Sequence, residues 1–171
     1  IDAFFTSTSA VTTTGLVVVD TGSYYSLFGQ LVILTLIQVA GLGYMIFFTV
    51  IIAGLGGKLS FTSRMQLWDS MNRPSSFEIV KFAKLIILFT FIIEIIDGIG
   101  LGVYWMRSFN PLRAFYSGIF HSISGFCTAG FGLFPDSFIS YKGSFAVNFI
   151  VDAVCIAGAI GFFVMYDVYK Y

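Results

Sequence analysis

The stretch SAVTTTGLVVVD, residues 9–20, places a short polar run inside a strongly apolar sequence. Hydrophobic residues make up 57% of the 171 residues, charged residues make up 11%, and the mean hydropathy is +0.91. Soluble domains average about 25% charged residues, so this composition does not suit a surface that faces water. No charged residue occurs from Thr21 to Gly57, which is longer than the ~20 residues that cross a bilayer. We therefore predict an integral membrane protein.

Charge and cysteine content exclude several classes of protein. Nine basic residues balance nine acidic residues, so we expect no polyanionic partner such as nucleic acid. Cys127 and Cys155 cannot form a disulfide framework or a metal cluster, and we expect no resident cofactor. The chain begins at Ile1 with no basic region typical of a signal peptide, which suggests a segment cut from a longer protein.

Apolar runs predict an all-α membrane protein. Two shorter stretches, 2–19 and 111–134, are interrupted by Ser, Thr and Gly, and each reads as a re-entrant segment: a short helix followed by an extended return. Asn110 as N-cap and Pro111 in the first turn predict that the second short helix begins there and runs to about Gly125. Asp2 suits the start of the first short helix, because a carboxylate is favoured at the positive N-terminal end of a helix. Long spanning helices are expected over residues 26–55, 77–106 and 143–168.

The segment 57–84 is the most basic part of the chain and predicts the orientation. It contains five Lys or Arg residues against only Asp69 and Glu78, so the positive-inside rule places it in the cytoplasm. Both re-entrant segments then enter the membrane from its outer side. Ser75 and Glu78 form a candidate capping box for the middle helix.

The chain contains an internal repeat. IDAFFTSTSAVTTTGL (1–16) aligns with YSGIFHSISGFCTAGF (116–131), and AGLGYM (40–45) aligns with GAIGFF (158–163). Two copies of one unit are therefore present, each with a pore loop followed by a spanning helix. We divide the chain into the pore loop and second helix of repeat 1 (1–56), a cytoplasmic linker (57–76) and repeat 2 (77–171).

Threonine and glycine in the two loops match the needs of a dehydrated cation. Carbonyl oxygens can replace hydration waters, and glycine permits the backbone angles that keep them aimed at one axis. The C-terminal, partly negative end of each short helix is aimed at the same place. The candidate filter residues are Thr12, Thr13, Thr14 and Gly15 in the first loop and Cys127, Thr128, Ala129 and Gly130 in the second.

These residues resemble a known family. TAGFG (128–132) is a variant of the potassium-channel filter T-V-G-Y-G, and TTGLV (13–17) is a more degenerate copy. With GLGYM (41–45) and GGKLSFTSRMQL (56–67), the chain resembles the Trk/Ktr/HKT superfamily of potassium and sodium uptake proteins over essentially its whole length. The resemblance implies four membrane–pore–membrane repeats around one pore, of which this chain holds the first two.

The resemblance also implies function and partners. It implies potassium uptake across the cell membrane by a multi-pass protein surrounded by lipid, in which Gly15 favours K⁺ over Na⁺. It further implies a homodimer and a cytosolic nucleotide-binding ring, which we expect to dock near residues 57–76. Conduction requires no covalent chemistry, so we do not expect an enzyme.

Alternative interpretations remain for several features. The Thr/Gly runs could be a helix-packing face, and the glycines at 41–43 and 158–161 are expected to be close-packing points or flexible points of the cavity-lining helices. Glu94 and Asp97 share one face of the middle helix, where pairing with short-helix hydroxyls or backbone N–H groups explains them as well as conduction does. Other functions left open are a dimeric two-repeat potassium channel, a structural membrane subunit, and an intramembrane enzyme that uses His121 and Cys127.

Overall fold

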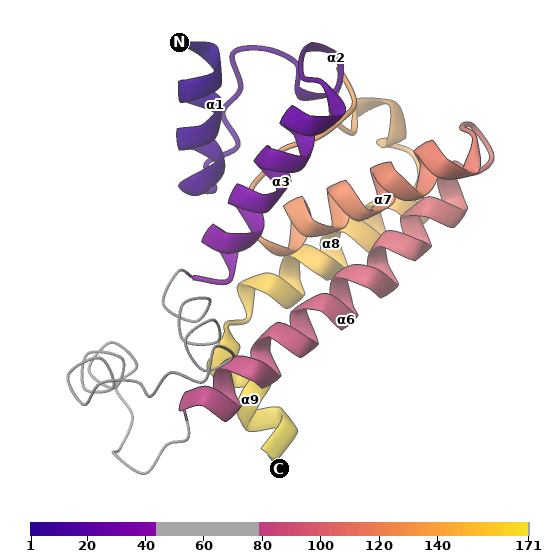
Figure 1. Ribbon diagram of the computed structural model, residues 1–171. Helices are drawn as coiled ribbons and strands as arrows, with labels where there is room; N and C mark the ends of the chain where they lie inside the picture. The colour runs from indigo at the N-terminus through magenta and orange to yellow at the C-terminus, as the bar shows by residue number, and fades with distance from the viewer. Residues whose placement is uncertain (44–78, 171) are drawn as a thin grey trace.

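The computed structural model describes residues 1–43 and 79–170 of the chain. Within these ranges the protein is helical and contains no strand, so the all-α prediction is confirmed there. The predicted linker (57–76), the candidate capping box of Ser75 and Glu78, and the far end of the helix expected over 26–55 lie outside the described residues. The described helices are α1 (Asp2–Val11), α2 (Thr21–Tyr24), α3 (Leu27–Gly41), α6 (Ile79–Trp105), α7 (Pro111–Phe126), α8 (Phe145–Ala159) and α9 (Phe162–Lys170), with a 3-10 turn η1 at Ile139–Tyr141 (Figure 1).

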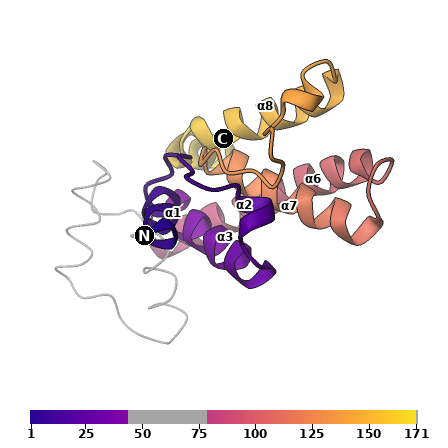
Figure 2. The same ribbon diagram turned by 90° about the horizontal axis from the view of Figure 1, so that it is seen from above.

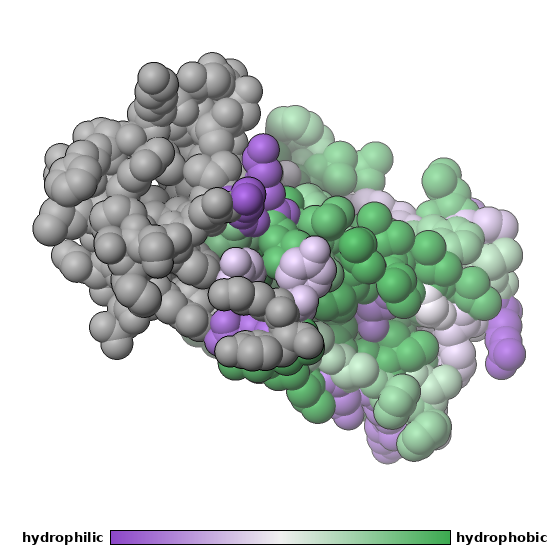
Figure 3. Space-filling view, turned by 90° about the horizontal axis from the view of Figure 1, so that it is seen from below, coloured by the Kyte–Doolittle hydropathy of each residue, from purple (hydrophilic) through white to green (hydrophobic). Residues whose placement is uncertain are grey.

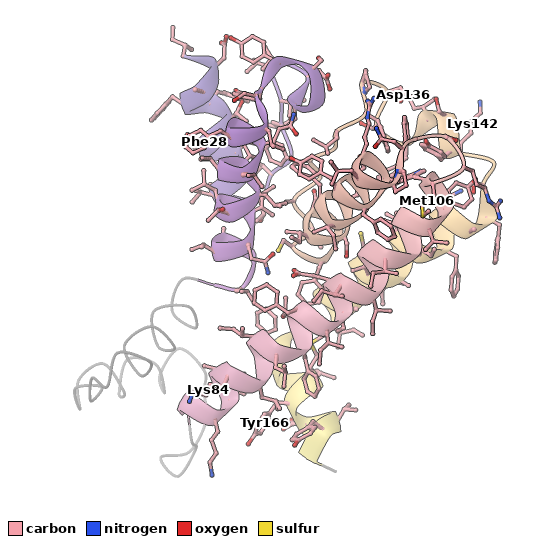
Figure 4. All side chains as sticks on the ribbon, turned by 45° about the vertical axis from the view of Figure 1, so that its right-hand side comes forward. Phe28, Lys84, Met106, Asp136, Lys142 and Tyr166 are labelled. Carbon is pink, nitrogen blue, oxygen red and sulfur yellow. The ribbon has the colours of Figure 1, made fainter. Side chains whose placement is uncertain are left out.

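Helix α6 is the longest element and is the part of the described chain best suited to cross a membrane. Its segment Lys81–Trp105 has a mean hydropathy of 2.2, and it is the one described helix that is both long and apolar enough for a span. At 1.5 Å per residue it covers more than the ~30 Å of a bilayer's hydrocarbon core. Lys84 lies near one end of α6, whereas Asp136 and Lys142 lie toward the other (Figure 4).

Apolar side chains remain on the outside of the molecule. Those on α6 include Ile92, Ile95, Ile96, Ile99 and Val103, each at least 43% exposed. Figure 3 shows a broad hydrophobic area across one face, with hydrophilic residues toward its edges. An outward-facing apolar surface of this kind suits contact with lipid rather than with water.

The predicted start signals form the expected caps. The side chain of Asn110 accepts a hydrogen bond of 2.8 Å from the backbone N–H of Arg113, and Pro111 occupies the first turn of α7. Two serines cap the longer helices of the repeats in the same way. Ser26 is the N-cap of α3, and Ser144 is the N-cap of α8. Because the two serines are equivalent in the two repeats, the internal duplication extends into the helix starts.

Two helices end earlier than predicted. The helix expected over 143–168 is broken, because α8 ends at Ala159 and α9 begins at Phe162. Gly161 between them has φ +91°, and the aligned Gly43 just after α3 has φ +76°. A residue with positive φ cannot continue a right-handed helix, so each of these glycines ends one.

The other glycines of the same two motifs are close-packing points, as predicted. A Cβ atom on Gly41 would collide with the side chain of Cys127. A Cβ atom on Gly158 would collide with the carbonyl group of Phe126. The longer helix of each repeat therefore touches the end of α7 at a position where only glycine fits.

Helices α6 and α7 also approach closely through small residues. Gly98 and Gly102 are one turn apart on α6, and a Cβ atom on Gly118 of α7 would collide with the carbonyl oxygen of Gly98. The spacing is that of the small-xxx-small motif, which lets membrane helices pack backbone to backbone. The middle helix thus lies against the outer side of α7 rather than against the two loops (Figure 1).

Seen from above, α7 lies between α3 and α8 (Figure 2). The core joins four helices and is built from Ala10 of α1, Ile33 and Ile37 of α3, Phe120 and Phe126 of α7, and Val154 of α8. All six side chains are at most 4% exposed. This core holds the C-terminal ends of α1 and α7 next to each other, which determines where the two loops lie.

Candidate ion-conduction site

The two candidate filter loops have the same backbone structure. Helix α1 ends at Val11 and α7 ends at Phe126, which are equivalent positions in the sequence repeat. Each helix is closed by the same three backbone hydrogen bonds, between 2.8 and 3.3 Å long. These run from the N–H groups of Thr12, Thr13 and Thr14 to the carbonyls of Thr8, Ala10 and Ser9, and from Cys127, Thr128 and Ala129 to Ile123, Gly125 and Ser124.

Both loops place a threonine and a glycine at positive φ. The angle is +49° at Thr13 and +50° at Thr128, then +74° at Gly15 and +72° at Gly130. Positive φ at a β-branched residue is a genuine outlier, and such strain clusters at functional sites. The two equivalent threonines therefore share the same unusual backbone angle, which makes the loops candidates for a functional site.

The carbonyl oxygens of both loops are available to a ligand. Within residues 1–43 and 79–170, no hydrogen bond ends on the carbonyls of residues 12–15 or 127–130. Thr12, Thr14, Thr128 and Gly130 are exposed, so carbonyls of these loops are open to water or to a cation. The two loops present two runs of four carbonyls that accept from no donor in the described residues.

The structure brings the two predicted loops together. A Cβ atom on Gly15 would lie 2.7 Å from the carbonyl oxygen of Ala129 and 3.2 Å from the Cα of Gly130. A Cβ atom on Gly130 would lie 3.4 Å from the Cα of Gly15. The predicted filter glycines therefore face one another across the contact between the repeats.

The threonine hydroxyl groups of the first loop brace the loop itself. The hydroxyl of Thr12 donates to the carbonyl of Thr8 at 2.9 Å, and it lies 3.1 Å from the hydroxyl of Thr14. The hydroxyl of Thr14 also lies 3.1 Å from that of Ser9. The hydroxyls of Thr12 and Thr14 therefore turn back toward α1 and not away from the loop.

His121 braces the second loop. Its Nδ1 donates to the carbonyl of Ser117 at 2.8 Å, and its Nε2 accepts from the N–H of Leu133 at 3.2 Å. The ring is 3% exposed and stacks on Phe134, with ring centroids 4.8 Å apart. The bond to Leu133 ties the chain that leaves the second loop to the helix that enters it.

The enzyme alternative, in which His121 and Cys127 form a nucleophilic pair, lacks a free base. A general base needs a ring nitrogen that is free to take a proton from the nucleophile. Both ring nitrogens of His121 are engaged with backbone groups, so the geometry does not support the enzyme alternative. In the described residues, no group of three His, Cys, Asp or Glu side chains could hold a metal ion.

Two acids of α6, Glu94 and Asp97, lie between α6 and the helices around it. Glu94 is 2% exposed and accepts a hydrogen bond of 2.9 Å from the side-chain amide of Gln38 on α3. The predicted contact with a short-helix hydroxyl exists in another form, because Ser122 of α7 donates to the backbone carbonyl of Glu94 at 2.8 Å. Asp97 lines a hollow of 380 Å³ between α6 and α8 whose other walls are apolar or glycine. These contacts fit the structural interpretation of both acids.

An exposed carboxylate follows each loop. Asp136 accepts from the hydroxyl and from the N–H of Ser140, and these bonds hold the pKa of Asp136 below its usual value. Asp20 accepts from the hydroxyl and the N–H of Ser23 in the same way. Each repeat thus carries a negative charge beyond its loop, on the side away from the C-terminal end of the short helix.

Two side-chain amides were not identified from the sequence. Gln30 on α3 donates to the carbonyls of Gly22 and Tyr25, at 3.1 and 2.9 Å. Its equivalent on α8, Asn148, donates to the carbonyls that precede that helix. A signal was present in the sequence, because each amide stands in an apolar run four residues after the capping serine.

The described residues form an all-helical fold with one helix that is long and apolar enough to cross a membrane, which fits the class of helical membrane proteins. Sequence comparison identifies the family: the TrkH family, described as cation transport protein, matches residues 1–171, so the chain belongs to this family. The predicted membership of the Trk/Ktr superfamily is confirmed.

Named relatives match nearly the whole chain. It is 41% identical over 170 residues to the Ktr system potassium uptake protein B of Bacillus subtilis. It is 35% identical over 171 residues to the potassium/sodium uptake protein NtpJ of Enterococcus hirae, and 34% identical over 170 residues to the Ktr system potassium uptake protein B of Vibrio alginolyticus. The matches cover 99%, 100% and 99% of this chain, and the chain spans 38%, 38% and 37% of the three relatives.

Proposed function

We propose that the protein takes up K⁺ across the cell membrane, along a path lined by backbone carbonyls of Thr12–Gly15 and Cys127–Gly130. The observation that carries this proposal is the pair of matching loops, which face each other and whose eight carbonyl oxygens accept from no protein donor in the described residues. The names of the relatives support the choice of ion, since three of them are potassium or potassium/sodium uptake proteins.

The physical basis is replacement of hydration water. A cation that enters a narrow path loses water ligands, and fixed carbonyl dipoles compensate for that loss. The C-terminal ends of α1 and α7, which carry partial negative charge, add to the attraction at the same place. The carboxylates of Asp20 and Asp136 raise the local concentration of cations near the entrance.

The short helices support a re-entrant topology. Helix α1 has 10 residues, and at 1.5 Å per residue it covers about half of the ~30 Å hydrocarbon core. After α1 and after α7 the chain continues as a loop and not as further turns of the same helix. In this proposal α6, α8 together with α9, and the helix expected over 26–55 that begins with α3 cross the membrane, so the protein is multi-pass and both loops enter from the outer side.

Flux into liposomes tests this function. The native full-length protein should carry K⁺ faster than Na⁺, and Gly130→Ser should lower the K⁺/Na⁺ ratio. Gly143→Ser is the matched control, because Gly143 lies beyond the second loop and a Cβ atom there would meet no neighbour within 4 Å. Equal ratios for the native protein and both variants would contradict the assignment of the loop as a filter.

Two partners belong to the proposal. A second copy of the protein forms a homodimer, and a cytosolic nucleotide-binding ring docks on the basic linker at residues 57–76. The local support is the excess of Lys and Arg in that linker. A pull-down in which the protein lacking 57–76 retains the ring at full strength would remove that docking site.

Two other functions give different results in the same experiments. A dimeric two-repeat channel predicts that a native chain with one further upstream helix and a stop soon after Tyr171 is sufficient for selective flux. A structural subunit predicts no flux from the purified protein, even with the cytosolic ring added. Neither has an observation in its favour that matches the paired, strained loops.

A further inference from the structure

A chain of side-chain hydrogen bonds connects the two short helices. The hydroxyl of Tyr116 on α7 donates to Oε1 of Gln30 on α3 at 2.8 Å. Gln30 donates through Nε2 to the carbonyl of Tyr25 at 2.9 Å, and the hydroxyl of Tyr25 donates to Oγ1 of Thr6 on α1 at 2.8 Å. This series of hydrogen bonds therefore connects α7 to α1 through the start of α3.

Gln30 and Thr6 are shielded from water, whereas the two tyrosines that join them, Tyr25 and Tyr116, are half-buried. Gln30 is 8% exposed and Thr6 is 1% exposed. Gln30 engages its carbonyl oxygen and donates twice from its amide nitrogen, although it stands in an otherwise apolar part of α3. Buried polar groups that are satisfied in this way fix one arrangement of their neighbours, because any other arrangement leaves a group unpaired.

A second series of contacts also connects Gln30 to α7. Gly22, which accepts from Gln30, packs against the carbonyl of Leu133, where a Cβ atom would not fit. The N–H of Leu133 in turn donates to His121 on α7. Gln30 is thus linked to α7 by two routes: directly through Tyr116, and through the chain that leaves the second loop.

We propose that Gln30 is a positioning residue for ion selectivity, which sets the distance between the two filter loops through Tyr116 and Tyr25. This inference rests on the proposed function of the loops. Gln30 touches no filter atom, and it acts on the approach of Gly15 to Ala129 by fixing α1 relative to α7. Its equivalent Asn148 differs, because within the described residues it bonds only to Tyr141 and Lys142 of its own repeat.

Tyr116→Phe in the native full-length protein is the decisive variant. It removes the hydroxyl that joins Gln30 to α7 and keeps the ring. The matched control is Tyr104→Phe, which also removes one tyrosine hydroxyl in a hydrogen bond, to Ser144 at 2.9 Å between α6 and α8. We expect Tyr116→Phe to lower the K⁺/Na⁺ permeability ratio in liposomes by about fivefold, the factor that corresponds to one net hydrogen bond. Tyr104→Phe should leave the ratio unchanged.

A double-mutant cycle separates positioning from simple stability. Gln30→Leu should lower the ratio at least as much as Tyr116→Phe, and the two changes together should add nothing to Gln30→Leu alone. If Gln30→Leu yields no folded protein, the comparison of Tyr116→Phe with Tyr104→Phe decides alone. Equal melting temperatures and equal ratios in those two variants would overturn the proposal. A native protein without any K⁺ preference would instead contradict the proposed function itself.

Discussion

The contact between Gly15 and Ala129 leads to a prediction about selectivity. Replacing Gly15 by Ala adds one methyl group at a position with φ +74°. The left-handed angle costs an L-residue about 1–2 kcal/mol. The methyl group would also lie 2.7 Å from the carbonyl oxygen of Ala129, well inside the 3.4 Å at which ordinary contact begins. Relieving such overpacking costs typically ~1–3 kcal/mol.

The overpacking acts on a proposed ligand of the ion. The oxygen that must move is the Ala129 carbonyl, so the strain changes the filter as well as the stability. We expect Gly15→Ala to reduce the K⁺/Na⁺ permeability ratio by about tenfold, which corresponds to ~1.4 kcal/mol of lost discrimination. Paired K⁺ and Na⁺ fluxes in liposomes that contain equal amounts of each purified variant measure this ratio.

Gly43→Ala is the matched control. Gly43 has nearly the same angle, φ +76°, but a Cβ atom there would meet nothing within 4 Å. The control therefore carries the backbone strain without the displaced carbonyl, and its ratio should stay within about twofold of the native value. Gly130→Ala should fall between the two, because its Cβ contact of 3.4 Å is ordinary. Similar ratios for Gly15→Ala and Gly43→Ala would refute the reasoning.

Three further predictions concern the elements around the loops. Gly118→Ala should lower the thermal stability in detergent by ~1–3 kcal/mol, because its methyl group would force α6 and α7 apart. The control Gly100→Ala lies on the side of α6 that faces α8, where its methyl group meets only Ile150 at 3.6 Å, and it should be neutral or stabilising. Equal melting temperatures for the two variants would contradict the close-packing account. His121→Phe should cost about 1–3 kcal/mol, since it leaves the N–H of Leu133 without its partner, and unchanged stability in a melting curve would show that this bond contributes nothing. Asp97→Asn should lower the yield of folded protein more than it changes the K⁺/Na⁺ ratio, and normal yield with an altered ratio would place Asp97 in the conduction path.

Local signals in the sequence predicted much of the fold. Asn110 and Pro111 identified the start of α7, and the long, mainly apolar run identified α6, because caps and hydropathy depend on neighbouring residues. The repeat also predicted that Gly15 and Gly130 are equivalent, and their φ angles agree within 2°. That equivalence was readable because two copies of one unit preserve the residues that their shared backbone needs.

Features that depend on distant contacts could not be predicted. Periodicity alone does not show that GAIG ends a helix, since glycine in a membrane helix can equally be a packing residue. The positive φ of Thr128 was unexpected because β-branched residues disfavour that angle, and only the surrounding structure can impose it. The partnership of Gln30 with Tyr116 joins residues far apart in the sequence, for which a single sequence carries no signal.

The most direct test of the central claim is to locate a heavy analogue of K⁺ in the native full-length protein. Crystals prepared with Tl⁺ in place of K⁺ would be examined for anomalous scattering. The account predicts Tl⁺ peaks between the two loops, within coordination distance of carbonyl oxygens from residues 12–15 and 127–130. Occupied Tl⁺ sites elsewhere, for example beside Glu94, with none between Gly15 and Gly130, would contradict it.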